Sequence, residues 1–76
     1  MKSGVLRYSK DTDRWCFCGV SLEYGLQCGE VIALKINDEY IEGRIEMDRQ
    51  DNWYCIFRNA AFTLRRGCEY MAKSIF

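Results

Sequence analysis

Hydrophobic and polar residues alternate along much of the chain with the period of a β-strand. The segment 39–47 shows this most clearly. One set of alternate positions runs from Ile41 to Met47 and is apolar or glycine, and the other runs from Tyr40 to Glu46 and is polar. Successive side chains of a strand point to opposite faces, so the segment predicts a strand with one buried and one solvated face. No window of useful length shows the 3.6-residue period of an amphipathic helix.

The same criteria predict further strands separated by polar turns. They cover residues 5–8, 14–18, 30–36, 53–57 and 69–76, with turns at residues 10–13, 37–38 and 49–52. Residues 53–57 are apolar on both faces, which indicates a strand with neighbours on both sides. We expect at most one helical turn, around residues 63–66. Five or six short strands favour a small barrel, because closure removes the free edges that an open sheet exposes.

The two halves of the chain match each other at an offset of 38 residues. The matched pairs are Trp15 with Trp53, Leu26 with Leu64, Gly29 with Gly67, and Asp13 with Asp51, and one extra residue, Cys68, interrupts the register. In each half a Leu-x-x-Gly sequence precedes a strand, which predicts a tight turn whose leucine enters the core. The predicted core residues are Leu26, Ile32, Leu34, Ile41 and Ile45.

Five cysteines and no histidine limit the chemistry available to the chain. An odd number of cysteines without a signal peptide indicates reduced thiols in a cytoplasm, and the Cys16-x-Cys18 spacing does not match usual zinc sites. Without histidine, Ser-His-Asp and Cys-His pairs are excluded, and no glycine-rich phosphate loop is present. We therefore expect no enzyme, no metal and no cofactor; a thiol enzyme or metal protein ranks third among the alternatives.

Three short sequences also resemble a known family. They are Leu26-x-Cys28-Gly29-Glu30, then Tyr40-Ile41-x-x-Arg44-Ile45-Glu46, then Trp53-Tyr54. The chain from about Gly4 to Leu64 is similar to a family of small domains of unknown function from Gram-positive bacteria, their phages and integrative elements. Gln27 stands where histidine is common in the family, and Tyr40 where tryptophan is common. The resemblance implies a single SH3-like barrel over residues 1–76 and an origin in a phage or mobile element, but no activity.

Charge and aromatic residues suggest two candidate binding surfaces. The chain carries eleven basic and eleven acidic residues and no apolar run long enough for a membrane helix, so neither membrane nor general nucleic-acid binding is favoured. Residues 37–51 form an acidic segment, net −4 from six acidic and two basic groups, while residues 53–76 are net +3. Eleven aromatic rings are too many for a small core, and a surplus of exposed rings indicates a partner.

We therefore predict a non-enzymatic cytoplasmic module that binds a basic protein surface through an acidic hairpin. One specific hypothesis is inhibition of a host defence nuclease, as anti-CRISPR proteins do. The predicted contact residues are Tyr24, Tyr40, Glu42, Arg44, Glu46 and Tyr54. The alternative is a nucleic-acid-binding barrel that uses exposed rings with Arg58, Arg65 and Arg66. A purely structural interpretation of Arg44 and Glu46, as a charge ladder that stabilises the strands, also stays open. The oligomeric state is not predicted.

Overall fold

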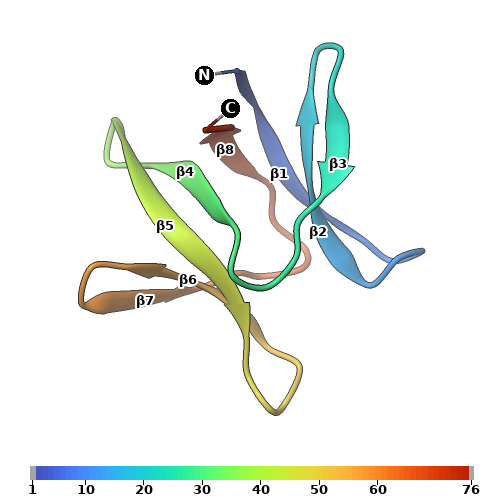
Figure 1. Cartoon of the computed structure of the whole chain (residues 1–76), viewed down its shortest axis with the longest axis vertical. Helices are drawn as coiled ribbons and strands as arrows, with labels where there is room; N and C mark the ends of the chain where they lie inside the picture. Colours follow the sequence, from blue (N-terminus) through green and yellow to red (C-terminus); the bar gives the residue numbers. More distant parts are fainter. Residues whose placement is uncertain (1, 76) are drawn as a thin grey trace.

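The computed structural model describes residues 2–75 and shows eight antiparallel strands in one sheet (Figure 1). The strands are β1 (Ser3–Ser9), β2 (Arg14–Gly19), β3 (Glu23–Gly25), β4 (Val31–Ile36), β5 (Glu39–Met47), β6 (Trp53–Phe57), β7 (Ala60–Thr63) and β8 (Tyr70–Lys73). The all-β prediction is confirmed. Residues 2–75 contain no helix, and hence none that could cross a membrane.

Two details of the predicted barrel are wrong. The sheet has eight strands rather than five or six, and its order, β3-β2-β1-β8-β4-β5-β6-β7, leaves β3 and β7 as unpaired edges, so the sheet formed by residues 2–75 is not closed. The additional strands β3 and β7 contain only 3 and 4 residues, too few to show an alternating pattern. Residues 63–66 form no helical turn, which lies within the predicted limit of at most one turn. Instead β7 ends at Thr63, and the Cys68 N–H donates to the Arg65 carbonyl across a tight turn.

The internal repeat is a real feature of the fold. Strands β1 to β4 of the first half correspond in turn to strands β5 to β8 of the second half. When every strand in the sheet order is replaced by its counterpart, the result is the same order read from the other end. The last strand of each half pairs with the first strand of the other half, since β4 pairs with β5 and β8 pairs with β1. The topology therefore has an approximate two-fold symmetry.

Equivalent local contacts support this symmetry. The Leu26 N–H donates to the Trp15 carbonyl at 2.7 Å, and the Leu64 N–H donates to the Trp53 carbonyl at 2.9 Å. The preceding turns match as well: the backbone φ angles of Asp13 and Asp51, each two residues before a tryptophan, are 52° and 64°. The offset of 38 residues thus identifies structurally equivalent positions.

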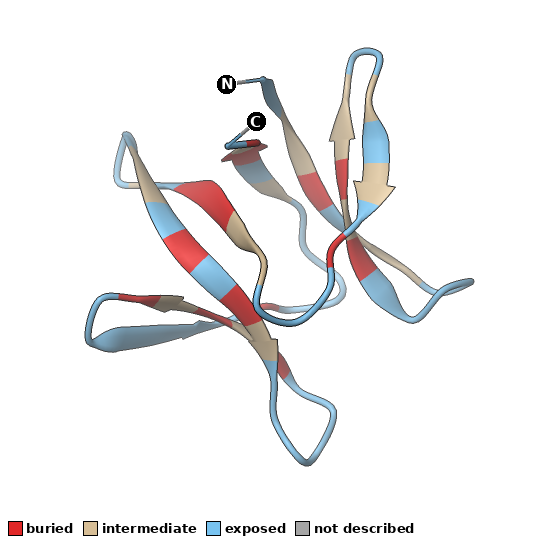
Figure 2. Cartoon of the chain, in the orientation of Figure 1, coloured by how far each residue is buried: buried red, intermediate tan, exposed pale blue. Residues whose placement is uncertain are grey.

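The core lies between the inner faces of the curved sheet, and its residues alternate with exposed ones along the strands (Figure 2). Of the predicted core residues, Leu26, Ile32, Leu34 and Ile45 are at most 1% exposed, and Ile41 is half-buried against the core. Gly43 lies opposite Phe57, and a side chain there would place its Cβ 2.6 Å from the Phe57 ring. A glycine is therefore required for this ring to pack on β5.

Candidate functional site

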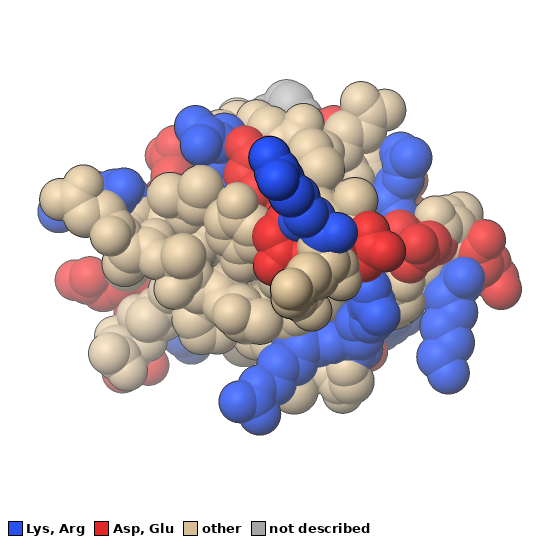
Figure 3. Space-filling view, turned by 90° about the horizontal axis from the view of Figure 1, so that it is seen from below, with Lys and Arg blue, Asp and Glu red and all other residues tan. Residues whose placement is uncertain are grey.

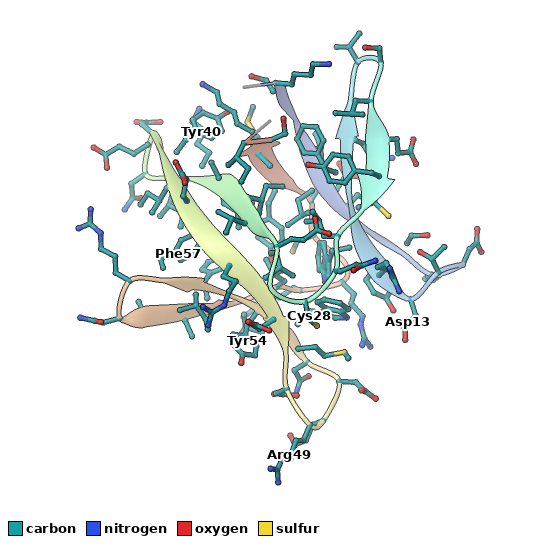
Figure 4. All side chains as sticks on the ribbon, viewed as in Figure 1. Asp13, Cys28, Tyr40, Arg49, Tyr54 and Phe57 are labelled. Atoms are coloured by element: carbon teal, nitrogen blue, oxygen red, sulfur yellow. The ribbon has the colours of Figure 1, made fainter. Side chains whose placement is uncertain are left out.

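The outward face of β5 collects most of the residues predicted to contact a partner. Tyr40, Glu42, Arg44 and Glu46 occupy alternate positions of this strand, and Tyr54 of β6 lies opposite Glu46. Directly opposed residues of paired strands point to the same face. We call these five residues the β5 face. Figure 4 shows Tyr40 and Tyr54 toward opposite ends of β5, so the charged side chains lie between two tyrosines.

Two contacts involve charged side chains on or next to the β5 face. The Arg44 Nε donates to Glu46 Oε2 at 2.6 Å, with 53% of the Arg44 side chain and 26% of the Glu46 side chain exposed. The Lys73 ammonium lies 4.3 Å from the centroid of the Tyr40 ring. Exposed ion pairs contribute little to stability, so the main effect of the first contact is to hold the guanidinium in one orientation. That pair joins residues of one strand and is not a rung between strands.

The prediction that residues 37–51 form an acidic hairpin is wrong. The segment is strand β5 with a turn at each end, and β5 pairs with β4 along residues 39–44 and with β6 along residues 44–47. Its acidic groups are spread along the strand and both turns, with Lys35 placed opposite Tyr40. On the face of the molecule seen from below, acidic and basic side chains lie beside one another (Figure 3).

Tyr24 is not part of the β5 face. It lies on the short edge strand β3, on the core side, opposite Phe17, and the two ring centroids are 5.6 Å apart. Partial burial raises the pKa of its hydroxyl, with a smaller contribution from Glu30. Sheet order places β3 and β5 at a distance from each other, because β2, β1, β8 and β4 lie between them. The structure therefore does not bring Tyr24 together with Tyr40 and Tyr54.

The three arginines of the nucleic-acid alternative do not form one patch. Arg58 lies in the turn between β6 and β7, whereas Arg65 and Arg66 follow the opposite end of β7. Arg66 Nη2 donates to the Asp51 carbonyl at 2.9 Å, and its guanidinium lies 5.0 Å from the centroid of the Tyr8 ring. Arg66 thus bridges the two halves of the repeat.

An open depression of about 540 Å³ adjoins the β5 face. Its lining residues are Glu39, Tyr40, Ile41, Glu42, Phe57 and Arg58. Sequence patterns did not identify this depression. The sequence contains one feature that indicates the depression, the difference in length between the predicted strands at 39–47 and 53–57. A long strand beside a short one keeps part of its own edge unpaired.

All five thiols are free. Cys16 and Cys18 lie on one face of β2, as the alternation predicts, whereas Cys55 is fully buried. Burial raises the pKa of the Cys55 thiol to about 12, so this group is neutral at physiological pH. Within residues 2–75 no three cysteine or carboxylate side chains gather as a metal-ligand set.

These features define a small all-β domain with an internal repeat. Residues 4–72 match the model of a family described as "Domain of unknown function (DUF5348)", and the chain belongs to this family. It is also similar to a crystal structure of a protein from Ruminococcus gnavus, with 30% sequence identity and a TM-score of 0.72 over 95% of this chain and 99% of that chain. No curated protein matches the chain significantly.

Proposed function

We propose that the protein is a non-enzymatic binding module that contacts another protein through the β5 face. The observation that supports this proposal best is the arrangement of two tyrosines and an oriented arginine on one outward face of the sheet. Tyrosine and arginine are enriched among residues that dominate binding energies at protein interfaces. A rigid sheet also holds these side chains in place before binding, which lowers the entropy cost of association.

The chemistry of the β5 face fits a basic partner surface. Glu42 has the small residue Ala33 as its neighbour on β4, and no ion pair of Glu42 is found among the described residues. Further carboxylates lie in the turns at both ends of β5. Complementary charge of this kind sets the specificity and the rate of association. One form of the proposal is that a phage or mobile element uses the protein to occupy the basic groove of a host defence nuclease.

Charge reversal tests this proposal. A partner is recovered by affinity purification, and its binding to the wild type and to a Glu42→Lys, Glu46→Lys variant is compared. We expect at least tenfold weaker binding of the variant, because two attractive interactions become repulsive. An Asp11→Lys, Glu23→Lys variant is the matched control, since it changes the net charge equally on the other half of the chain. Its affinity should stay within about twofold of wild type, because charges outside the contact act only through a screened field.

Two results would contradict the proposal. Wild-type affinity of the Glu42→Lys, Glu46→Lys variant would place the contact elsewhere, and a loss of affinity in the Asp11→Lys, Glu23→Lys variant would indicate the loop around Tyr24. The second result concerns random single- and double-stranded oligonucleotides. Binding to them with a steep salt dependence, lost when Arg65 and Arg66 are both replaced by glutamate, would favour the nucleic-acid alternative.

A further inference from the structure

Strand β5 is longer than the strand beside it. It contains 9 residues, and β4 pairs with it from Glu39 to Arg44. On the other side β6 contains 5 residues and pairs with β5 only from Arg44 to Met47. Residues 39–42 of β5 therefore have a strand on one side and none on the other within the described chain.

The register shows which backbone groups face this open side. The two-residue turn between β4 and β5 has φ angles of 50° at Asn37 and 68° at Asp38, as a hairpin turn of this length requires. Ile36 and Glu39 then form a hydrogen-bonded pair. By the alternation of an antiparallel ladder Ile41 also bonds to β4, while the N–H and C=O groups of Tyr40 and Glu42 point away from it. Neither residue has a ladder partner on that side in residues 2–75.

The neighbouring hairpin leaves this edge uncovered. Beyond Phe57 the chain turns sharply at Arg58, whose φ is 52°, and returns as β7 instead of continuing along β5. The depression described above lies in the space that a longer β6 would fill, and Tyr40 and Phe57 lie beside it (Figure 4). The fold thus contains a strand position that is open on one side.

The side chains around the depression indicate the chemical character of a segment that would bind there. Ile41 and Phe57 belong to its core side, where they meet the hydrophobic core. Glu39 and Glu42 contribute two carboxylates and Arg58 one guanidinium, and none of the three is in an ion pair among the described residues. An added strand would point alternate residues toward Ile41 and toward the outward face beside Glu42.

We propose that the open edge of β5 is a strand-addition site for an extended, basic segment of a partner protein. The segment pairs antiparallel with β5 through the backbone groups of Tyr40 and Glu42. One apolar side chain packs against Ile41 and Phe57, and a lysine or arginine on the opposite face of the segment lies beside Glu42. Strand addition of this kind takes its affinity from backbone hydrogen bonds and its specificity from alternate side chains. This inference rests on the proposed function, because it names the part of the partner that the β5 face would receive.

A peptide titration followed by NMR tests this site. The full-length ¹⁵N-labelled protein is titrated with a nonapeptide of alternating lysine and valine, and a glutamate–valine nonapeptide is the control. We expect saturable amide shifts centred on Tyr40 and Glu42 with the lysine peptide, and at least tenfold weaker binding of the glutamate peptide. Glu42→Gln should reduce this preference several-fold while leaving the backbone pairing in place.

Two variants of Tyr40 separate backbone pairing from side-chain contact. Tyr40→Pro removes an N–H that faces the open side and not β4, and proline is tolerated at such edge positions. Tyr40→Ala removes the same ring but keeps the N–H. We expect the proline variant to bind the lysine peptide at least tenfold more weakly than the alanine variant, with both amide spectra otherwise retaining the native dispersion.

The outcomes distinguish this inference from the proposed function. Equal binding by the two Tyr40 variants, no saturable shifts, or shifts centred on the β3 or β7 edge would overturn strand addition. If the recovered partner loses affinity on reversal of Glu42 and Glu46 but not with Tyr40→Pro, the β5 face is a contact surface and strand addition is wrong. If reversal of Glu42 and Glu46 has no effect on the partner, the proposed function itself fails.

Discussion

Replacing Ile45 with alanine perturbs the point where the two halves of the fold meet. The Ile45 side chain is 0% exposed, and its backbone N–H and C=O bond to Glu30 and Gly29 of the first half at 2.8 and 2.7 Å. Alanine keeps these backbone bonds, so the substitution reports on side-chain packing alone. The loss of three carbon atoms at ~0.8 kcal/mol each gives about 2.4 kcal/mol. The cavity left behind increases the cost, toward the upper part of the ~2–5 kcal/mol range for such substitutions.

Urea denaturation followed by tryptophan fluorescence measures this cost, because Trp15 and Trp53 are both buried in the core. A domain of this size has a total stability of roughly 4–11 kcal/mol, so the variant retains a measurable folded baseline only if the wild type lies in the upper part of this range. Ile45→Val, expected to cost ~0.5–1.5 kcal/mol, keeps the test open if the alanine variant does not fold. Ile41→Ala, at a half-buried position of the same strand, should cost less. A cost below about 1 kcal/mol for Ile45→Ala would refute the packing described here.

Further predictions concern three single residues, Arg58, Cys55 and Asp48. Arg58→Gly should raise stability by about 0.5–1 kcal/mol in the same urea assay, because glycine adopts the positive φ of 52° without the clash of a Cβ, whereas Arg58→Ala should not. The Cys55 thiol should resist Ellman's reagent in the folded state while the exposed Cys28 and Cys68 react. Burial raises the pKa of Cys55 from 9.0 to about 12, so the thiol ionises more readily in the unfolded state than in the folded state. The contribution of Cys55 to the free energy of unfolding is therefore complete below pH 9 and declines between pH 9 and about pH 12. The difference in free energy of unfolding between wild type and Cys55→Ala should narrow over the same pH range. Hydrogen bonds from the backbone N–H groups of Asn52 and Gln50 lower the pKa of Asp48 below its usual 3.8. The contribution of the Asp48 carboxylate to stability is therefore present above pH 3.8 and is lost at lower pH. The difference in Tm between wild type and Asp48→Ala should shrink below pH 3.8.

Local patterns predicted the elements that show strict alternation or an internal match. The strand at 39–47, the two tryptophan strands and the burial of Leu26 and Leu64 follow from such patterns. The short strands β3 and β7 were missed because 3 or 4 residues carry no periodic signal. Barrel closure was expected as a remedy for free edges, and the structure leaves β3 and β7 at the two ends of the sheet order instead.

The candidate site could be predicted only where its residues share one strand. Alternation places Tyr40, Glu42, Arg44 and Glu46 on one face, and the pairing of β5 with β6 adds Tyr54. Tyr24 was grouped with them because it is aromatic, although sheet order separates it from β5. The open edge beside Tyr40 depends on where β6 ends relative to β5, which is a property of long-range pairing and not of any single segment.

Site-specific photo-crosslinking determines whether the partner contacts the β5 face. The crosslinking amino acid benzoylphenylalanine replaces Tyr40, Tyr54, Tyr24 or Phe62, an exposed residue of edge strand β7, in separate variants. Each variant is mixed with the partner recovered by affinity purification and irradiated. These positions are all aromatic, so the substitutions are closely matched in size. We expect covalent adducts from positions 40 and 54 and none from positions 24 and 62. Adducts from position 24 or 62, with none from 40 and 54, would contradict this expectation.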